Sequence, residues 1–416
     1  MNALCYKIVF SKRLGALVAV GEHTAGQGKA TGTGVRTVVY PRTAMGTSAD
    51  GFVGALKSVC ASVALTCFTA TVAAAPDANT LPTGYSVNSG NVAVSTAGAN
   101  MTIKQSTDKA SVNWQSFSIG SAASVNIQQN SASSVLLNRV VGNDPSQIFG
   151  KLTANGQVIL INPNGIVFGK GGSVTASAFT ASTFGMTEDD FIKGKRKFSR
   201  NGSTASVTVE EGASINTTTP GGYIALIAAN VNNQGTLSTK QGAVVMASAE
   251  TVALPSALTD NVGIPLSSKV RLELAPSTLN ASVENGGTIT TEGGQVLMQA
   301  AAVADAVASV THTGTIDTSG VQGGAVTLLA EGGIIKATGD ITANSSHGTA
   351  GGDIIIGRDE FTGELAKSTD VSGAKLESNK GFIETSGHDL KVDDIQVKAA
   401  NWLLDPDNID ITGDAT

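Results

Sequence analysis

Residues 156–169 read GQVILINPNGIVFG, and this stretch decides the fold. Two apolar runs flank four turn residues, Asn162, Pro163, Asn164 and Gly165. An Asn that opens a turn can accept a hydrogen bond from a backbone N–H two residues on, Pro fixes φ at the next position, and Gly tolerates a positive φ. The run 158–161 is unbroken and rich in β-branched residues, which predicts a strand buried on both faces. From its chemistry alone, the stretch is a tight hairpin or coil corner in an all-β core.

Further motifs occur in order on both sides of this turn. They are MTI at 101–103, VNWQSFSIG at 112–120, VLLNRV at 135–140 with Asn138 and Arg139, DPSQI at 144–148 beginning with Asp144 and Pro145, LTANG at 152–156, and AST at 181–183. In this order the chain resembles the amino-terminal secretion domain of two-partner secretion exoproteins, from about residue 81 to residue 330. These are the filamentous-haemagglutinin-like and high-molecular-weight adhesins of Gram-negative bacteria.

The resemblance implies a fold, a location and partners. The fold would be a right-handed parallel β-helix, recognised by a dedicated outer-membrane transporter. The protein would be secreted or held at the cell surface of a Gram-negative bacterium. An adhesive role would add a host-cell surface receptor or glycan as a second partner.

The composition favours repetitive β structure over a compact enzyme domain. The 416 residues include 49 glycines and only 14% charged residues, whereas globular domains average about 25%. Low charge can indicate disorder, but 41% hydrophobic residues, many of them β-branched, favour stacked strands. The length allows two or three globular domains or one elongated solenoid.

The segment 1–75 has the pattern of a targeting sequence. Scattered cations precede a basic Gly/Thr-rich stretch, and the run 52–73 is apolar apart from one lysine and small polar residues. The small residues that a signal peptidase requires follow as Ala73, Ala74 and Ala75. The run 52–73 is long enough to span a bilayer, so a transmembrane anchor is the alternative. The Ala-rich end favours cleavage, and the opening resembles the extended signal peptides of large secreted exoproteins.

Cysteine and charge divide at the same boundary. Cys5, Cys60 and Cys67 lie in the leader, so the mature chain would contain no disulfide. The leader has seven Lys/Arg and two Asp/Glu, a net charge of +5, whereas the remainder has 20 and 31, a net charge of −11. That balance disfavours nucleic acid and anionic membranes as partners.

Two short signatures alternate from position 210 onward. The first is a small turn that is followed by a polar residue, usually Thr or Ser, and then by an aliphatic residue. Its copies lie at 212–215, 235–237, 287–289, 314–316 and 339–341. The second is Gly followed by an apolar run, at 222–226, 242–246, 294–298, 324–328 and 352–356. Neighbouring copies are separated by roughly 20 to roughly 30 residues, an interval that predicts a solenoid. One gap, from Gly242 to Gly294, is longer and holds about two coils or one coil with an insertion.

The repeat predicts an all-β stack of coils, and the resemblance implies that this stack is a right-handed parallel β-helix with extra-helical hairpins and loops. Each coil would supply two or three short strands, with alternate side chains stacked inward and glycines at the corners. At ~25 residues per coil, the mature chain would form ~13 coils over about 60 Å. A sandwich also has short strands between turns, but two signatures recurring in one order favour the helix.

One charged segment, TEDDFIKGKRKF at 187–198, interrupts the pattern. We expect an excursion from the solenoid with a helical turn begun by Thr187, because acidic residues follow it. The segment is either a solvated loop, the simpler interpretation, or a loop that binds a partner.

The sequence offers no convincing catalytic, cofactor or metal site. After the leader it has three histidines, His312, His347 and His388, far apart and without metal-ligand spacing. It has no P-loop, nucleophile elbow or dinucleotide fingerprint. Solenoids can carry acids on one face, so a polysaccharide-processing enzyme is the alternative.

We therefore divide the chain into an extended signal peptide at 1–75, a secretion-domain β-helix at 76–330, and further solenoid repeats at 331–416. The segment NWLLDP at 401–406 resembles the point where family members enter a long repetitive stalk, which implies a truncated chain. The expected protein is a non-enzymatic exoprotein, exported by its transporter, that nucleates β-helix folding and acts as an adhesin. The alternatives are the stalk of a contact-dependent toxin and a haem- or hemopexin-capturing exoprotein.

Overall fold

The structure, a computed structural model, describes residues 6–11, 16–21 and 74–407. Strands β1 (Tyr6–Ser11) and β2 (Ala16–Gly21) pair with each other as an antiparallel hairpin. Apart from Ala74 and Ala75, the rest of the leader lies outside the described residues, including Ala73, the three cysteines and the apolar run at 52–73. Among the described residues, no helix is long and apolar enough to cross a bilayer.

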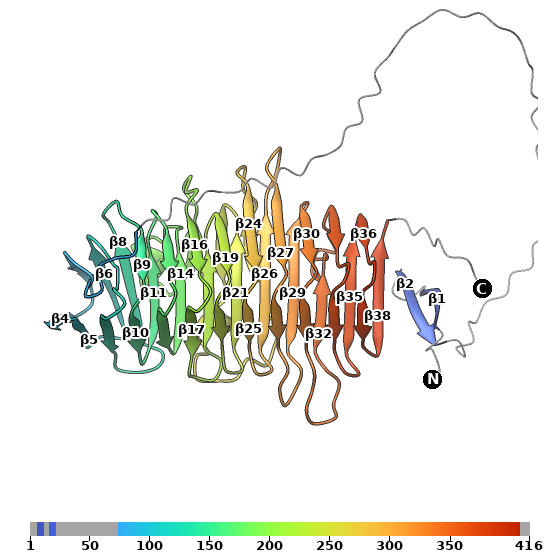
Figure 1. Cartoon of the computed structure of the whole chain (residues 1–416), viewed down its shortest axis with the longest axis horizontal. Coiled ribbons are helices and arrows are strands. Elements are labelled where there is room, and N and C mark those ends of the chain that lie inside the picture. Colours follow the sequence, from blue (N-terminus) through green and yellow to red (C-terminus); the bar gives the residue numbers. More distant parts are fainter. Residues whose placement is uncertain (1–5, 12–15, 22–73, 408–416) are drawn as a thin grey trace, which may run out of the picture. The chain divides into compact units, whose positions relative to one another are not determined.

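From residue 78 the chain folds as a right-handed parallel β-helix with three faces (Figure 1). The first face contains β3 (Ser86–Ser89), β6 (Lys109–Trp114), β8 (Val135–Val140), β11 (Gln157–Ile161), β14 (Ala178–Ser182), β18 (Tyr223–Ile227), β21 (Ala243–Ser248), β26 (Gln295–Ala301), β29 (Ala325–Glu331), β32 (Asp353–Ile356), β35 (Phe382–Gly387) and β38 (Asn401–Pro406).

The second face is a 12-stranded sheet. It contains β4 (Val92–Ala97), β5 (Asn100–Gln105), β7 (Ser124–Gln128), β10 (Lys151–Ala154), β13 (Ser173–Ala176), β17 (Ser214–Thr217), β20 (Thr236–Ser238), β25 (Thr288–Thr290), β28 (Thr315–Asp317), β31 (Asp340–Thr342), β34 (Lys375–Glu377) and β37 (Gln396–Lys398).

The third face is a 9-stranded sheet. It contains β9 (Ser146–Ile148), β12 (Ile166–Phe168), β16 (Ser206–Val209), β19 (Asn230–Asn233), β24 (Ala281–Asn285), β27 (Ala308–His312), β30 (Ile334–Ala337), β33 (Ser368–Asp370) and β36 (Asp389–Lys391).

The two sequence signatures correspond to two of these faces. The Gly–Thr–aliphatic copies form strands of the second face, from β17 to β31, and the Gly–apolar copies form strands of the first, from β18 to β32. Without the antiparallel β4, the second face has eleven parallel strands, one per coil. At about 4.8 Å per coil the described solenoid is therefore about 50 Å long, shorter than the expected length of about 60 Å. The difference arises because two insertions consume residues without adding coils.

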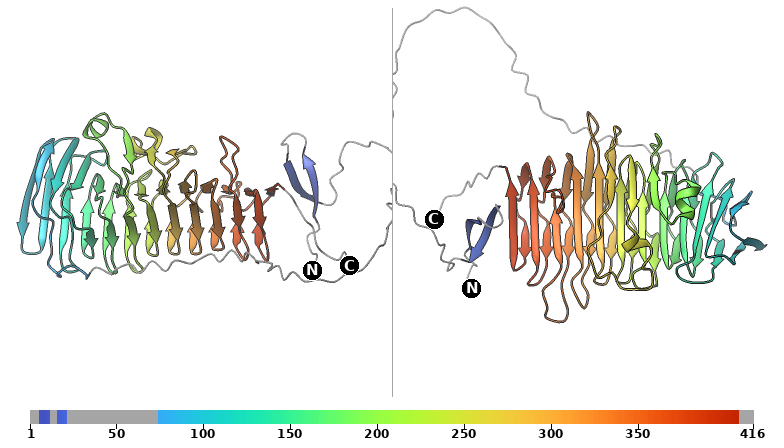
Figure 2. Two further views of the ribbon diagram at one scale, coloured as in Figure 1. Left: turned by 90° about the horizontal axis from the view of Figure 1, so that it is seen from above. Right: turned by 180° about the vertical axis from the view of Figure 1, so that it is seen from behind.

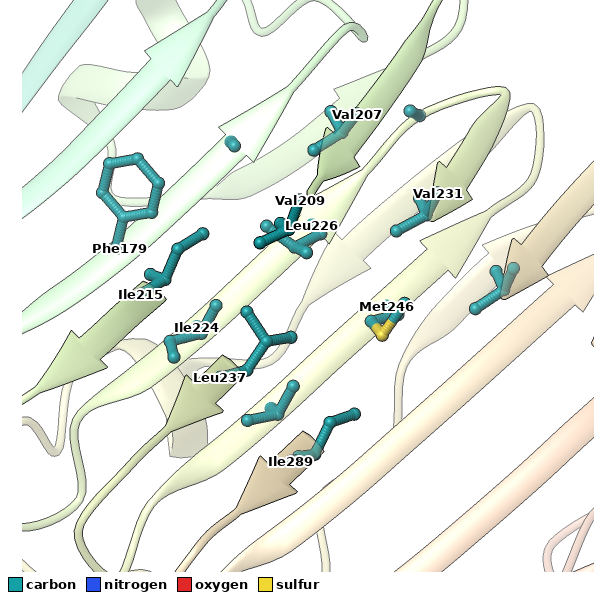
Figure 3. Close-up of a cluster of buried hydrophobic side chains, with 14 of the residues drawn as sticks. Phe179, Val207, Val209, Ile215, Ile224, Leu226, Val231, Leu237, Met246 and Ile289 are labelled. Atoms are coloured by element: carbon teal, nitrogen blue, oxygen red, sulfur yellow. The ribbon is translucent and has the colours of Figure 1, made fainter. Parts of the chain in front are cut away.

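The interior of the solenoid is a continuous stack of aliphatic side chains. Figure 3 shows part of this stack, with Ile215, Leu237 and Ile289 following one another along the second face. All three are fully buried. Each coil alone has too little apolar surface to fold, so burial between neighbouring coils supplies most of the stability.

From β8 to β21 the first face is apolar on its outer side as well, where the insertions pack against it. In β11, Val158 and Leu160 belong to the interior core, whereas Ile159 and Ile161 belong to a second core outside the sheet. This confirms the prediction of a strand buried on both faces. From above, the inserted elements stand on one side of the solenoid (Figure 2).

The first insertion contains α1 (Glu188–Ile192) and β15 (Arg196–Ser199). The second contains β22 (Thr251–Leu254), α2 (Ser256–Thr259) and β23 (Glu273–Ala275), and β15, β22 and β23 form a small antiparallel sheet. Because β21 pairs directly with β26, the long gap in the sequence repeat is one coil with an insertion.

A polar ladder lies inside the third face. The Asn233 amide donates to Oδ1 of Asn285 over 2.7 Å, and Nδ2 of Asn285 lies 3.1 Å from Nδ1 of His312. All three side chains are fully buried. A buried polar group is tolerated only when it is hydrogen-bonded. Here the hydrogen-bond partner of each buried side chain is supplied by an adjacent coil.

Candidate functional site

The motif at 162–165 forms a hydrogen-bonded turn at the end of β11. The N–H of Gly165 donates to the carbonyl of Asn162 over 3.1 Å, and the N–H of Asn164 donates to Oδ1 of Asn162 over 2.9 Å. Gly165 has a φ of +120°, a value that residues with a side chain rarely adopt. Pro163 and Asn164 are exposed at the tip.

This turn is stacked on the corner of the preceding coil. Nδ2 of Asn162 donates to the carbonyl of Asp144 over 2.9 Å and to Oγ of Ser146 over 3.0 Å. The Asn164 amide donates to the carbonyl of Gly142 over 2.8 Å. Pro145 completes the lower corner, with its Cβ 3.7 Å from the position that a Cβ on residue 165 would occupy. The motifs at 144–148 and 162–165 therefore form one corner.

Asn138 occupies the interior at the middle of the same coils. Its side chain is fully buried, and its Oδ1 accepts from Nε1 of Trp114 over 3.0 Å. Its Nδ2 lies 3.4 Å from the carbonyl of Ile159. Asn138 therefore joins β6, β8 and β11, and no partner can contact it in the folded chain.

Arg139, the next residue, points outward and fixes the first insertion. Its guanidinium donates to Oε2 of Glu188 and to the carbonyl of Met186, both over 2.9 Å. Burial opposes ionisation of Glu188, but hydrogen bonds from Arg139, Ser89 and Ser111 outweigh burial and lower the pKa of this carboxyl. These contacts thus join β3, β6 and β8 to α1. No sequence pattern pointed to Glu188, because its partners lie far away along the chain.

The charged segment is an ordered excursion, as its sequence predicted. Thr187 is the N-cap of α1 and accepts from the N–H of Asp190, and Phe191 is fully buried beneath the helix. In the basic half of the segment, the lysines are exposed, whereas Arg196 is buried. These lysines, Lys193, Lys195 and Lys197, line an open hollow of about 640 Å³ together with Lys109, and the acids Asp260 and Glu273 only partly offset their charge. This hollow, which we call the lysine hollow, is basic although the chain after the leader is acidic.

The alanines at the expected cleavage region precede the solenoid. Ala73 lies outside the described residues, and Ala74 and Ala75 are exposed. The chain joins the solenoid at Ala78, whose carbonyl accepts from the N–H of Ala122 over 2.8 Å.

The described part of the chain contains no cluster of three or more His, Cys, Asp or Glu able to hold a metal. His312 belongs to the interior ladder, and His347 and His388 are exposed. The adjacent acids Asp359 and Glu360 each face a cation, Arg271 and Lys269 respectively.

Comparisons with known proteins agree with this architecture. Residues 78–354 match the model of the TPS secretion domain, and residues 1–49 match that of the extended signal peptide of the type V secretion system. A heme/hemopexin-binding protein of Haemophilus influenzae strain Rd is 45% identical over 127 residues, 30% of this chain and 14% of that protein. Another protein of the same name from Haemophilus influenzae is 41% identical over 119 residues, 28% of this chain and 12% of that protein.

The fold is matched by a crystal structure. The HMW1 secretion domain from Haemophilus influenzae superposes with a TM-score of 0.65 at 24% identity, over 78% of this chain and all of that chain. At that identity, the likeness concerns the fold alone. The chain spans only about one seventh of the length of the curated relatives.

Proposed function

Because the chain belongs to the TPS secretion-domain family of two-partner secretion exoproteins, we propose that its solenoid engages a dedicated outer-membrane transporter and nucleates folding outside the cell. The observation that carries this proposal is the family match across residues 78–354, preceded by the secretion signal at 1–49. The antiparallel cap made by β3 and β4 supports nucleation at the amino-terminal end of the solenoid. Because the cap closes that end, further coils can be added only in the carboxy-terminal direction.

Co-expression tests the export step. The full chain is produced in a Gram-negative host with and without its cognate transporter, and the chain in the medium is quantified. We expect export only with the transporter. Equal amounts in the medium without the transporter would contradict the proposal.

The lysine hollow is the candidate contact for acidic groups of the transporter. Its exposed lysines have few partners to lose, since only Lys193 forms an ion pair with a carboxylate of the described chain, Asp189, and that pair is solvent-exposed. Lys193→Ala, Lys195→Ala and Lys197→Ala together should lower export and leave the melting temperature unchanged. The matched control replaces three exposed lysines elsewhere on the solenoid, Lys336, Lys367 and Lys391.

The proposed activity beyond export is adhesion to a host-cell surface receptor or glycan. A second candidate is capture of haem or hemopexin, which the printed name of two relatives favours. Binding of the purified chain to cultured host cells, and its titration with hemin and hemopexin, separate the two. A non-enzymatic role is part of the proposal, and turnover of a polysaccharide by the purified chain would contradict it.

A further inference from the structure

A cavity of about 240 Å³ lies on the outer side of the first face, between the second insertion and the loop at 358–365. Its floor is made by β26 and β29, one wall by residues 269–274, and the rim by residues 359–361. The wall and the rim belong to segments that are distant in sequence, so no local pattern could reveal the cavity.

The wall is fixed by specific contacts to the solenoid. Oε1 of Gln295 accepts from the N–H of Val270 over 2.9 Å, and its Nε2 donates to the carbonyl of Ser268 over 2.6 Å. Lys269 forms an ion pair with Asp353 over 2.8 Å and a second with Glu360 on the rim. The cavity is therefore preformed.

The rim is a short hairpin loop that holds an aromatic ring at the mouth. Oδ1 of Asp359 accepts from the N–H of Phe361 over 2.7 Å. The guanidinium of Arg271 lies 4.7 Å from the Phe361 ring centroid, yet Phe361 is 58% exposed. One face of the ring is thus covered by Arg271, and much of the ring is open to solvent.

Three polar side chains line the cavity without a hydrogen-bond partner among the described residues. Gln299 is only 8% exposed, and its amide makes no hydrogen bond with any described residue. Within the part of the chain that the structure describes, Thr327 and Glu331 likewise make no side-chain hydrogen bond. The polar atoms of these three side chains are reached by solvent in the cavity and bind nothing in the described part of the fold, so they are free to hydrogen-bond a ligand.

We infer that this cavity binds one neutral sugar ring, with Gln299, Thr327 and Glu331 hydrogen-bonding its hydroxyl groups. An amide, a hydroxyl and a carboxyl provide both donors and acceptors, as sugar hydroxyls require. Leu297 and Leu329 on the floor and Phe361 at the mouth supply apolar surface for the C–H face of the ring. The volume is close to the lower limit of small-molecule pockets, about 300 Å³, which favours one ring over an extended chain.

The charge of the cavity argues against an anionic ligand. The cations Lys269 and Arg271 are already paired with carboxylates. Burial, together with the nearby carboxylates of Asp359 and Glu364, raises the pKa of Glu331. An added negative charge would increase this repulsion, whereas a neutral hydroxyl would relieve the desolvation of the carboxyl.

The test is a titration of the purified full chain with free sugars, followed by saturation-transfer NMR. The probes are glucose, galactose, mannose and N-acetylglucosamine, with cationic glucosamine as a separate arm. We expect saturable binding of at least one neutral sugar. Gln299→Leu should weaken this binding about tenfold and leave the melting temperature unchanged, because the Gln299 amide makes no hydrogen bond within the described part of the fold. Gln396→Leu, on the exposed surface of β37, is the matched control.

Three outcomes would overturn the inference. They are the absence of saturable binding by any neutral sugar, equal binding by the parent chain and Gln299→Leu, and binding of glucosamine alone, which would assign the cavity to a cation. The inference goes beyond export and is distinguishable from it, because the assay uses purified chain from whichever compartment contains it. If a sugar binds, competition with host glycoproteins and with bacterial surface polysaccharide distinguishes the source of the ring.

Discussion

Asn162 makes all of its side-chain contacts inside the fold. Its Oδ1 accepts within the turn, its Nδ2 donates to the corner of the preceding coil, and the residue is fully buried. A transporter could bind this amide directly only in the unfolded chain.

The turn was predictable, because Asn, Pro and Gly have strong local preferences. The contact with Asp144 and Ser146 was not, because contact between coils depends on register.

We predict that Asn162→Ala lowers stability by about 1–3 kcal/mol, since it leaves buried polar groups unpaired. Asn164→Gly keeps the backbone freedom of the turn tip and should have little effect on stability. Secretion yield should fall in proportion to the loss of stability, as measured by thermal melting of each purified variant. Secretion loss in Asn164→Gly with unchanged melting would instead favour direct recognition of the side chain.

His312 should make the stability of the solenoid depend on pH. Its Nε2 lies 3.3 Å from the carbonyl of Asp340 and must donate there, so Nδ1 accepts from the Asn285 amide and the ring is neutral. Burial lowers the pKa of His312 below its ordinary value of 6.5, although the hydrogen bonds to Asp340 and Asn285 oppose this. The unfolded chain therefore binds the proton first as the pH falls.

The predicted consequence is a loss of stability below about pH 6.5, of up to about 1.4 kcal/mol per pH unit, that ends at the pKa of the folded state. His312→Asn extends the amide ladder and should remove this part of the pH dependence. Denaturant unfolding of both proteins between pH 7.5 and 5.5 measures it. An identical slope in the variant would show that another group is responsible.

At the scale of elements, glycine begins the strands of the first face because successive coils approach closely at that corner. A Cβ on Gly294 would overlap the carbonyl oxygen of Gly242, and one on Gly324 would overlap that of Gly294. None of these three glycines has a positive φ. Glycine is therefore required at these corners because it has no side chain, and this explains why the Gly–apolar signature is repeated.

Gly294→Ala should therefore destabilise the solenoid by about 1–3 kcal/mol, the usual cost of overpacking. The control is Gly185→Ala, where a Cβ would lie no closer than 3.4 Å to a neighbour and φ is not positive. Thermal melting compares the two. Equal melting of Gly294→Ala and Gly185→Ala would mean that the corners can relax, and the close-approach explanation would be wrong.

The elements that the sequence predicted are those with a repeated local signal. From β17 onward, strands of the second face follow a turn with Thr or Ser and an aliphatic residue, strands of the first face have an initial glycine and an apolar run, and α1 has its Thr187 cap. A third strand per coil was allowed but could not be placed, because strands such as β19, with the sequence NVNN, contain one aliphatic residue among polar ones. The pairing of β15 with β22 was missed because the two strands are distant in sequence and belong to no repeat.

The candidate sites also divide into those formed by local sequence and those formed by contacts between distant segments. The turn at 162–165 is local and was predicted, whereas the partner of Arg139 depends on where α1 docks. The proposed sugar cavity depends on two segments that meet only because β26, β29 and β32 are adjacent. Such features arise from stacking, and one sequence carries no record of them.

At the scale of the whole molecule, the residues that stabilise the solenoid differ from those proposed to bind partners. The interior stack and the glycine corners hold the coils together, and the lysine hollow and the proposed sugar cavity both lie on the side covered by the insertions. A secreted chain without cysteines after Cys67 depends on this stacking instead of on disulfides.

The most direct test of the account is mass spectrometry of the chain recovered from the medium of cells that also produce the transporter. The account predicts a secreted species whose amino terminus lies between Ala74 and Asp77, because small residues end the apolar run and the solenoid begins at Ala78. Retention of the chain in the cells, or a secreted species that still contains the run 52–73, would contradict it.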